Sequence, residues 1–281
     1  MRRSINIKQD LETVRTIEDL TEVFESIASL HISKIRDRVV ASKDFFAELW
    51  QTYSALRIDP KKRLARAHTK KDSVFVAVAS QSKLSGQINE QVINELTNNL
   101  YKRPNTDVIL IGMQPNQALH NAKANVVGAF ALPKGDFNFN INDILETLNN
   151  YDKISVFYQT YESLRVQKIS HIDLVSTVRL LGEDVTEGNE TLSSEEYIFE
   201  PNVKEIADYM ESIMLGVALI QIIMESKLSQ YAARFNSMSA AKKRAGELTK
   251  QYKSEFYRSK RGESDERLKE MLKVAKRANA L

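Results

Sequence analysis

The residues best able to do chemistry are scattered along this chain instead of being gathered into motifs. The sequence holds no cysteine and four histidines, which are His31, His68, His120 and His171. No two of these histidines have the four-residue spacing that places zinc ligands on one face of a helix. The lack of cysteine excludes disulfides, thiolate metal sites and thiol nucleophiles. There is also no Gly-x-Ser-x-Gly nucleophile turn, so nothing in these patterns indicates an enzyme.

Phosphate-binding chemistry has weak support. The sequence contains neither Gly-x-Gly-x-x-Gly nor Gly-x-x-x-x-Gly-Lys-Ser/Thr. Gly86, in the segment 80–89, stands alone near the end of a predicted strand, which is too little for a dinucleotide site. The basic run 61–71 could bind phosphate, but it has no interleaved aromatic residue, and we favour a solvated linker. We therefore expect no cofactor and no metal in this chain.

The two ends of the chain are predicted to be long helices. Residues 1–59 contain neither proline nor glycine, and residues 202–281 contain no proline; these residues cost a helix interior about 3 and about 1 kcal/mol respectively. Apolar residues recur at steps of three and four in both ends, a spacing that indicates a helical stripe and, in the back end, a coiled coil. The front stripe comprises Ile7, Leu11, Val14, Ile17, Leu20, Phe24, Ile27, Leu30, Ile35 and Val39, and the back stripe Leu228, Tyr231, Phe235, Met238, Ala245, Leu248, Tyr252 and Phe256. The middle must return the chain to where it left, so we predict an antiparallel pair.

The middle of the chain alternates between strand and helix patterns, which favours a parallel sheet in an α/β layer. Strands are predicted at 73–79, 107–112, 126–132 and 153–161, and helices at 88–102, 116–123 and 142–150. Further strands at 165–172, 174–181 and 197–201 are expected as antiparallel additions at one edge, with a loop over 183–194. The predicted fold class is α/β: a long antiparallel coiled coil plus a Rossmann-like middle domain. The expected domains are 1–59, 60–201 and 202–281.

Composition and charge limit the partners and the cellular location that we expect for this chain. The chain has 281 residues and a formal net charge of only +3, so it is not a strong polyanion binder, and we expect no nucleic acid partner. The longest apolar run, 213–220, is shorter than the 18 or so residues that a membrane span needs. We predict a soluble, cytosolic protein.

The back helix carries a family resemblance. The segment 225–238, Glu-Ser-Lys-Leu-Ser-Gln-Tyr-Ala-Ala-Arg-Phe-Asn-Ser-Met, followed by Arg-Ala-Gly-Glu-Leu at 244–248, resembles the C-terminal helix of the gamma subunit of F-type ATP synthases. Other matches agree in order along the chain: Ile7-Lys8, Thr21, Ile27-Ala28, the segment 80–89, Phe157-Tyr158 and Tyr-Ile-Phe-Glu-Pro at 197–201. The resemblance thus spans nearly the whole chain.

The resemblance implies a central-stalk rotor. In this family the two terminal helices stand inside a ring of three catalytic and three non-catalytic ATPase subunits, which bind ATP and magnesium. The α/β middle, together with an epsilon subunit, contacts a membrane ring that translocates protons. The chain itself would be non-catalytic and without a cofactor. As part of such a complex it would be cytoplasmic and peripheral to the inner face of the cell membrane.

Candidate contacts to partner subunits follow from the matched motifs. They are Lys8, Arg15, Gly86, Asn89, Gln230, Ala233, Arg234 and Met238. Arg234, with Lys8 and Arg15 on the front helix, is expected to make charge contacts with the ring. The tip beyond Glu263 is polar and is expected to be interrupted by Gly262, so its removal should be tolerated better than charge reversal at Arg234.

The sequence departs from the family in several places. Where the family has a glycine-rich turn, this chain has Lys83, Ser85, Gly86 and Gln87. The family's glutamate before Ala-Ala-Arg is replaced by Gln230. The tip segment 259–265 is more charged than in the family, and Glu22 and Glu25 stand on the front helix. These departures leave two alternatives open: the rotor of a specialised F-type-like ATPase that drives a motility or secretion machine without a proton ring, or a coiled-coil scaffold.

Overall fold

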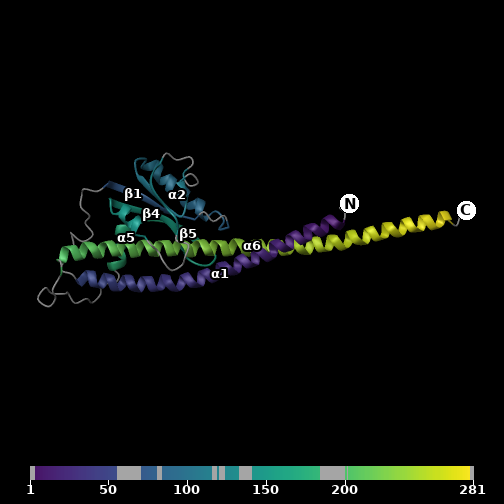
Figure 1. Cartoon of the computed structure of the whole chain (residues 1–281), viewed down its shortest axis with the longest axis horizontal. Helices are drawn as coiled ribbons and strands as arrows, with labels where there is room; N and C mark the ends of the chain where they lie inside the picture. Colours follow the sequence, from purple (N-terminus) through teal and green to yellow (C-terminus); the bar gives the residue numbers. More distant parts are fainter. Residues whose placement is uncertain are drawn as a thin grey trace. The chain divides into compact units, whose positions relative to one another are not determined.

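The two long helices are present, and they contribute to two compact units. The computed structural model describes residues 4–55, 71–80, 84–115, 119, 124–132, 141–183, 200 and 202–278. Helix α1 spans Ser4–Ala55 and helix α6 spans Val203–Ala278 (Figure 1). One unit, here called the coil unit, comprises Met1–Ile27 and Phe235–Leu281. The other, the sheet unit, comprises Ala28–Arg234.

The sheet unit contains a five-stranded sheet in the order β3-β2-β1-β4-β5. Its strands are β1 (Lys71–Val78), β2 (Asp107–Ile111), β3 (Asn125–Phe130), β4 (Tyr151–Tyr161) and β5 (Gln167–Asp173). The first four are parallel, and β5 pairs with β4 in the antiparallel sense. The predicted α/β layer with an antiparallel edge strand is confirmed.

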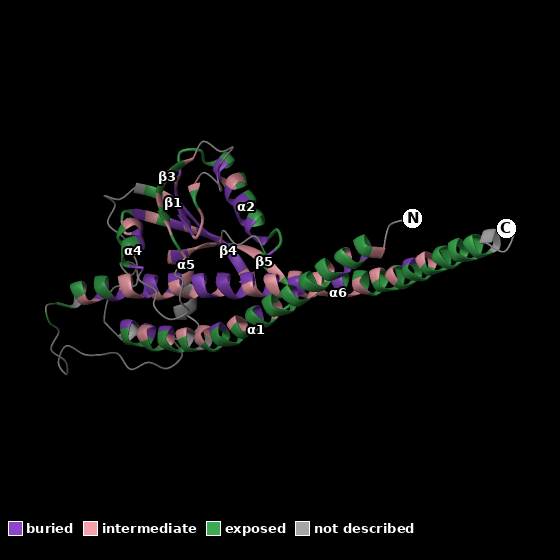
Figure 2. Cartoon of the chain, turned by 45° about the vertical axis from the view of Figure 1, so that its right-hand side comes forward, coloured by how far each residue is buried: buried purple, intermediate pink, exposed green. Residues whose placement is uncertain are grey.

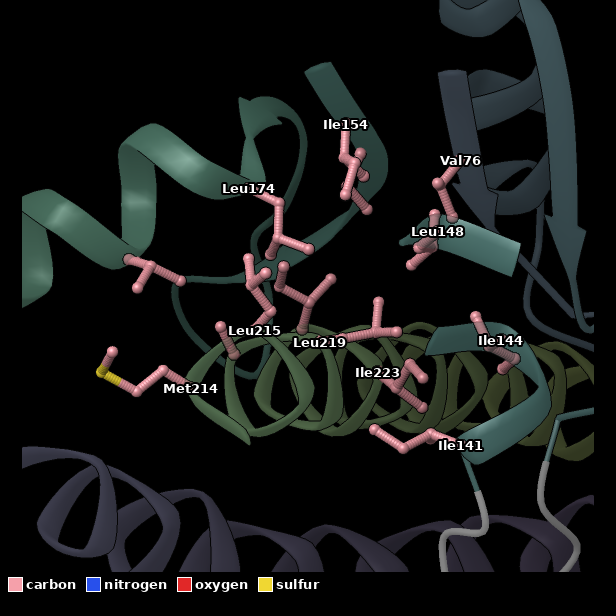
Figure 3. Packing of buried hydrophobic residues seen from close by; sticks show 14 of the residues in the cluster. Val76, Ile141, Ile144, Leu148, Ile154, Leu174, Met214, Leu215, Leu219 and Ile223 are labelled. Carbon is pink, nitrogen blue, oxygen red and sulfur yellow. The ribbon is translucent and has the colours of Figure 1, made fainter. Parts of the chain in front are cut away.

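Each face of this sheet has its own hydrophobic core. Helix α2 (Ile88–Lys102) packs on one face, where Phe75, Leu110 and Phe157 are buried. The other face packs against the first part of α6, helix α4 (Asn142–Leu148) and the end of α1. Figure 3 shows apolar side chains of α6 gathered between the helix and the sheet. The first part of α6 is therefore as much a layer of the α/β domain as a rod.

One predicted strand is a helix. The segment 174–181 was expected to be a strand because it is rich in β-branched and aliphatic residues, yet helix α5 spans Leu174–Glu183. Asp173 explains the change, since its carboxylate accepts a hydrogen bond from the Ser176 N–H at 2.8 Å, the geometry of a helix N-cap. Leu174 and Val178, one turn apart, are fully buried on the helix face toward the core.

Several predicted segments lie outside the described residues. They are most of the helix at 116–123, most of the strand at 197–201, the loop from 184 onward and the basic run apart from Lys71. The predicted break at Gly262 is wrong, because α6 continues through this residue to Ala278. A single glycine costs a helix only about 1 kcal/mol, which the surrounding helix formers offset.

The helices run antiparallel within each unit. In the coil unit, hydrogen-bonded partners on α1 and α6 are 259 residues apart in sequence at Ser4 and 217 apart at Glu25. In the sheet unit, Tyr53 donates a hydrogen bond to Glu211, a separation of 158 residues. The separation falls as α1 advances, which is the signature of an antiparallel pair.

The apolar part of α6 is longer than the sequence reading allowed. By length and composition, a window of this helix could cross a membrane, and 56% of that window is buried inside the protein. Met214, Leu219 and Ile223 in this part are among the largest fully buried side chains. Burial under the sheet accounts for the apolar character of these residues, and Figure 2 shows the same part of α6 as its most buried stretch.

Candidate functional site

A buried chain of hydrogen bonds joins four elements of the sheet unit. Gln159, near the end of β4, donates from Nε2 to Asn89 Oδ1 at 3.0 Å, and the Ser80 N–H after β1 donates to the same oxygen at 3.1 Å. On its other side, Gln159 Oε1 accepts hydrogen bonds from Ser226 Oγ and from Gln230 Nε2, the latter at 3.3 Å. Gln230 Nε2 also lies 3.1 Å from Ser226 Oγ. The set Asn89, Gln159, Ser226 and Gln230 is here called the amide network.

The amide network is sealed from solvent and carries no formal charge. The exposed fractions are 0% for Gln159 and Ser226, 5% for Gln230 and 6% for Asn89. Buried polar groups are costly unless they are hydrogen-bonded, and each of these side chains has a partner. The structure thus brings together two of the residues selected from sequence, Asn89 and Gln230, through a third that was not selected.

The position of the network in the sheet is informative. Strand β1 pairs with β2 on one side and with β4 on the other, so the chain reverses its winding between β1 and β4. In open α/β sheets, ligands bind at this reversal, beyond the carboxyl ends of the strands. Here Asn89 and Gln159 occupy that position and hydrogen-bond to each other. The described side chains at this position therefore hydrogen-bond to one another.

The seam of the coil unit mixes apolar residues with polar ones at positions where a coiled coil is usually apolar. On α1 a heptad of buried and half-buried positions in this unit runs through Ser4, Ile7, Leu11, Val14, Glu18, Thr21 and Glu25. Helix α6 presents Met238, Lys242, Ala245, Thr249, Tyr252, Phe256, Ser259 and Glu263 at the same spacing. Polar residues therefore take several core positions of the pair.

Direct contacts across the seam confirm this pairing. Thr249 Oγ1 donates a hydrogen bond to Glu18 Oε2 at 3.0 Å, and a Cβ added at Gly246 would lie 3.2 Å from Glu18 Oε1. Lys242 Nζ contacts Glu22 at 2.9 Å and Glu25 at 3.4 Å. The hydrogen bond to the Glu22 carboxylate raises the pKa of Lys242, and Glu25 acts in the same direction.

Several apolar side chains of α1 are exposed instead of lying in the seam. The front stripe predicted from sequence is therefore partly wrong: Ile7, Leu11 and Ile35 are buried, but Ile17, Leu20, Phe24, Ile27 and Leu30 are exposed. The outer stripe is defined here as Ile17 (46% exposed), Leu20 (51%), Val23 (54%), Phe24 (37%) and Ile27 (39%), and it includes Val23, which was not in the predicted stripe. Most of the early part of α1 is exposed in Figure 2. Exposed apolar patches on soluble proteins mark surfaces that contact a partner.

The charged candidates of α1 are on the surface. Lys8 is exposed and forms an ion pair with Glu12 one turn later, at 3.8 Å. Arg15 is also exposed. The two basic residues are two helical turns apart, so they lie on one face of α1. Exposed ion pairs of this kind contribute little to stability, which leaves Lys8 available to a partner.

The candidates on α6 divide into buried and half-buried residues. Ala233 and Met238 are 8% exposed and pack inside their own units. Arg234 is half-buried, and its guanidinium lies 5.3 Å from the centre of the Tyr231 ring. That ring in turn stacks on His31 of α1, with centroids 4.5 Å apart and an interplanar angle of 4°. The stack holds the Arg234 side chain in one place.

The local backbone conformation explains why residue 86 is a glycine, Gly86. Its φ is +64°, in the left-handed region that side chains disfavour, immediately before α2 begins at Ile88. This turn brings Asn89 into the first turn of α2 and hence into the amide network.

Two groups of residues were missed by reasoning from sequence. Gln159 interrupts the apolar run of a strand that is covered on both faces, and that interruption was the available signal for a buried polar site. Glu18, Thr21 and Glu25 were not placed in the seam because an apolar stripe was followed where the heptad continues through polar residues. In both cases the polar residue at a core position was the informative one.

Comparisons with known proteins agree along the whole chain. A family model described as ATP synthase matches residues 4–273. The ATP synthase gamma chain of Mycoplasmoides gallisepticum is 22% identical over 262 residues, covering 88% of this chain and 90% of that protein. The mitochondrial ATP synthase subunit gamma of Pichia angusta is 26% identical over 260 residues, covering 90% and 91%.

Solved structures show the same fold. A chain in the Euglena gracilis mitochondrial ATP synthase structure that contains OSCP, F1 and the c-ring aligns with a TM-score of 0.62 at 15% identity, covering 98% of this chain and 95% of that one. A chain from the central stalk and c-ring of the Tetrahymena thermophila mitochondrial enzyme aligns with a TM-score of 0.57 at 16% identity, covering 79% and 99%. Together with the match over residues 4–273, these relationships show that the chain belongs to the ATP synthase gamma family.

Proposed function

We propose that this protein is the central-stalk rotor subunit of an F-type ATP synthase or ATPase. In this role an asymmetric shaft couples ATP synthesis or hydrolysis in a catalytic ring to rotation of a membrane ion-translocating ring. The observation that carries the proposal is the coil unit, whose seam includes polar residues at several core positions and whose outer stripe is apolar. A rod that keeps apolar side chains on its outside is built to be surrounded by protein.

The mismatch in symmetry between the ring and the shaft makes the catalytic subunits differ from one another. A ring of three equivalent catalytic subunits around one asymmetric shaft cannot make three identical sets of contacts. Each catalytic subunit is then held in a different state, because a contact shifts a conformational equilibrium only when it differs between the states. On this proposal the outer stripe lies on one face of α1 and distinguishes the subunit that it contacts from the other two.

Nucleotide chemistry is assigned to the partners. The amide network lies where a doubly wound fold would hold a ligand, and its side chains hydrogen-bond to one another, which supports a non-catalytic role for this chain. ATP and magnesium would be bound by a ring of three catalytic and three non-catalytic subunits. An epsilon-like subunit and a membrane ring are the further partners that we propose, with the complex at the inner face of the cell membrane.

The partners can be identified directly. The chain should be tagged in its native cell, purified gently and analysed by quantitative mass spectrometry. Three copies each of two ATPase subunits for every copy of this chain are expected. A co-purifying membrane ring would support a synthase, and a different load would indicate a specialised rotary machine. Recovery of the chain without any ATPase subunit would overturn the proposal in favour of a scaffold.

The outer stripe provides a second, residue-level test. Leu20→Asp combined with Phe24→Asp should lower ATP-driven turnover of the assembled complex, because each carboxylate must be desolvated against the surrounding subunits. Leu20→Asp and Phe24→Asp are also made singly, and the matched control for each is Ser26→Asp, which adds the same single charge at an exposed position of the same helix away from the stripe. Equal turnover in the stripe variant and the control would contradict the assignment of this face to the ring.

A further inference from the structure

The amide network contacts α6 through two residues that lie one helical turn apart. Ser226 and Gln230, one helical turn apart, both donate to the single oxygen Oε1 of Gln159. The same Gln159 is tied through Nε2 to Asn89, which also accepts from the backbone after β1. We propose that Gln159 is the positioning residue that fixes the register of α6 against the sheet, both along the helix axis and about it.

Apolar packing does not fix this register alone. The face of α6 that packs on the sheet repeats similar apolar side chains at helical spacing, namely Met214, Leu215, Ala218, Leu219, Ile222 and Ile223. A displacement of one turn, about 5.4 Å, would place apolar residues against the same apolar surface. Ridges of side chains fit grooves in more than one such register.

The amide network discriminates between these registers. A shift of one turn in one direction brings Ile222 and Ser226 opposite Gln159, and a shift in the other direction brings Gln230 and Arg234. The first leaves the Oε1 of Gln159 without its Gln230 donor, and the second brings a cation into a pocket in which Gln159 is 0% exposed. Both leave buried polar groups badly matched, and a single buried polar contact is known to specify register between helices.

A fixed register of α6 would matter for the transmission of torque, and this consequence rests on the proposed function. If α6 is the shaft, torque between the shaft and the sheet loads this interface in the direction that the amide network resists. Gln159 then keeps the shaft from slipping against the α/β domain while it turns. The register itself can be measured without any partner subunit, so the two ideas can fail separately.

The experiment measures the position of α6 in the full-length chain. The natural chain has no cysteine, so Asn98→Cys on α2 and Asp208→Cys on α6 give two unique sites for spin labels. Both positions are exposed and lie in the sheet unit. Pulsed dipolar spectroscopy should give one narrow distance distribution. With Gln159→Leu added, we expect a second population displaced by up to about 5 Å, the rise of one turn.

Two further variants separate register from stability. Val156→Ala removes apolar contact from a fully buried residue of the same strand, and it should lower the melting temperature but keep one distance. The triple variant Gln159→Leu, Ser226→Ala and Gln230→Leu replaces the polar contact by apolar groups. It should melt above Gln159→Leu and still show two distances. One narrow distance in both Gln159 variants, or a split distribution in Val156→Ala, would overturn the inference.

Discussion

Ser4, the first described residue of α1, is bound to Glu263 of α6 through both of its polar groups. The Ser4 N–H donates to Glu263 Oε1 at 2.8 Å, and the Ser4 hydroxyl donates to Oε2 at 2.7 Å. The first N–H groups of a helix have no partner within the helix, and a negative charge there is favourable. A carboxylate from one helix therefore caps the amino end of the other.

This cap predicts the effect of Glu263 substitutions. Glu263→Ala should destabilise the start of α1 by about 1 kcal/mol, the usual cost of a lost cap, which corresponds to about fivefold faster exchange. Hydrogen exchange of the amides at the start of α1 is the measurement. Glu263→Gln keeps one acceptor oxygen and should lie between wild type and alanine. Glu266→Gln, at an exposed position one turn further, should leave exchange unchanged.

Lys242 predicts an alkaline weakening of the coil unit. Its hydrogen bond to Glu22 raises the pKa of Lys242 above the ordinary value of 10.5. The folded state therefore keeps the proton to higher pH than the unfolded state does. The stabilisation is complete below pH 10.5 and is lost as the pH rises through the folded pKa.

Denaturant unfolding of wild type and Lys242→Met at several pH values tests this point. The difference in unfolding free energy between the two proteins should shrink above pH 10.5. Lys253, exposed on the same helix, gives the control Lys253→Met, which removes the same charge at a surface position. A difference for Lys242→Met that stays constant with pH would show that the contact to Glu22 has no energetic effect.

Tyr158 gives a second pH dependence, in the sheet unit. Burial raises the pKa of Tyr158 to about 12, the charge of Glu225 adds to the effect, and the hydrogen bond with Thr160 opposes it. The unfolded chain loses this proton near pH 10 and the folded protein only near 12. The protein is therefore expected to lose stability between pH 10 and pH 12.

Tyr158→Phe removes the titrating group and should reduce that loss. Absorbance of ionised tyrosine gives the titration of Tyr158 directly, as the difference between wild type and variant. A Tyr158 titration near pH 10, the ordinary value for tyrosine, would contradict the burial argument.

Arg234 tests the contact between the shaft and the ring. Arg234→Glu should leave the chain folded and reduce ATP-driven turnover of the assembled complex by about tenfold or more, the loss expected for a charge-assisted hydrogen bond. Circular dichroism measures folding and a coupled assay measures turnover. Arg36→Glu, at an exposed position of α1 in the same unit, is the control. Unchanged turnover in Arg234→Glu would remove Arg234 from the contact.

The tip of α6 gives the last prediction. A chain ending at Glu263 keeps the cap on Ser4 and loses an exposed segment that mixes charged residues with Leu268, Met271, Leu272 and Val274, each 54 to 68% exposed. We expect this truncation to assemble with its partners and to lose less turnover than Arg234→Glu does. Native mass spectrometry of the complex measures assembly. Complete loss of assembly would show that the tip is an essential contact.

Much of the fold could be predicted from the sequence because the relevant signals are local. Apolar runs and breakers located α2 and the parallel strands to within a few residues, and the lack of proline located α1 and α6. Helix α5 was missed because its β-branched residues hid the cap at Asp173. A cap is one hydrogen bond between side chain and backbone, and composition does not report it.

The candidate site was harder to predict because it depends on residues distant in sequence. Asn89 and Gln230 were selected on a motif, but their connection runs through Gln159, 70 residues from Asn89 and 71 from Gln230. Ile17, Leu20, Phe24 and Ile27 of the outer stripe were assigned to the seam because apolar residues were assumed to be inside. Glu18 reverses that assumption, since Thr249 of α6 donates a hydrogen bond to its carboxylate within the seam.

The sheet unit also has a consequence for how the protein is made. Its main core joins Phe46, Trp50 and Tyr53 from α1 to Ala207–Ile223 of α6, with the sheet between them in the sequence. During synthesis the ribosome releases α1 and the whole sheet before this part of α6 exists. One apolar face of the sheet is then exposed to water until its covering helix has been made. Contacts between segments so distant in sequence are slow to form. Newly made chains should therefore depend on chaperones until translation has passed Ile223.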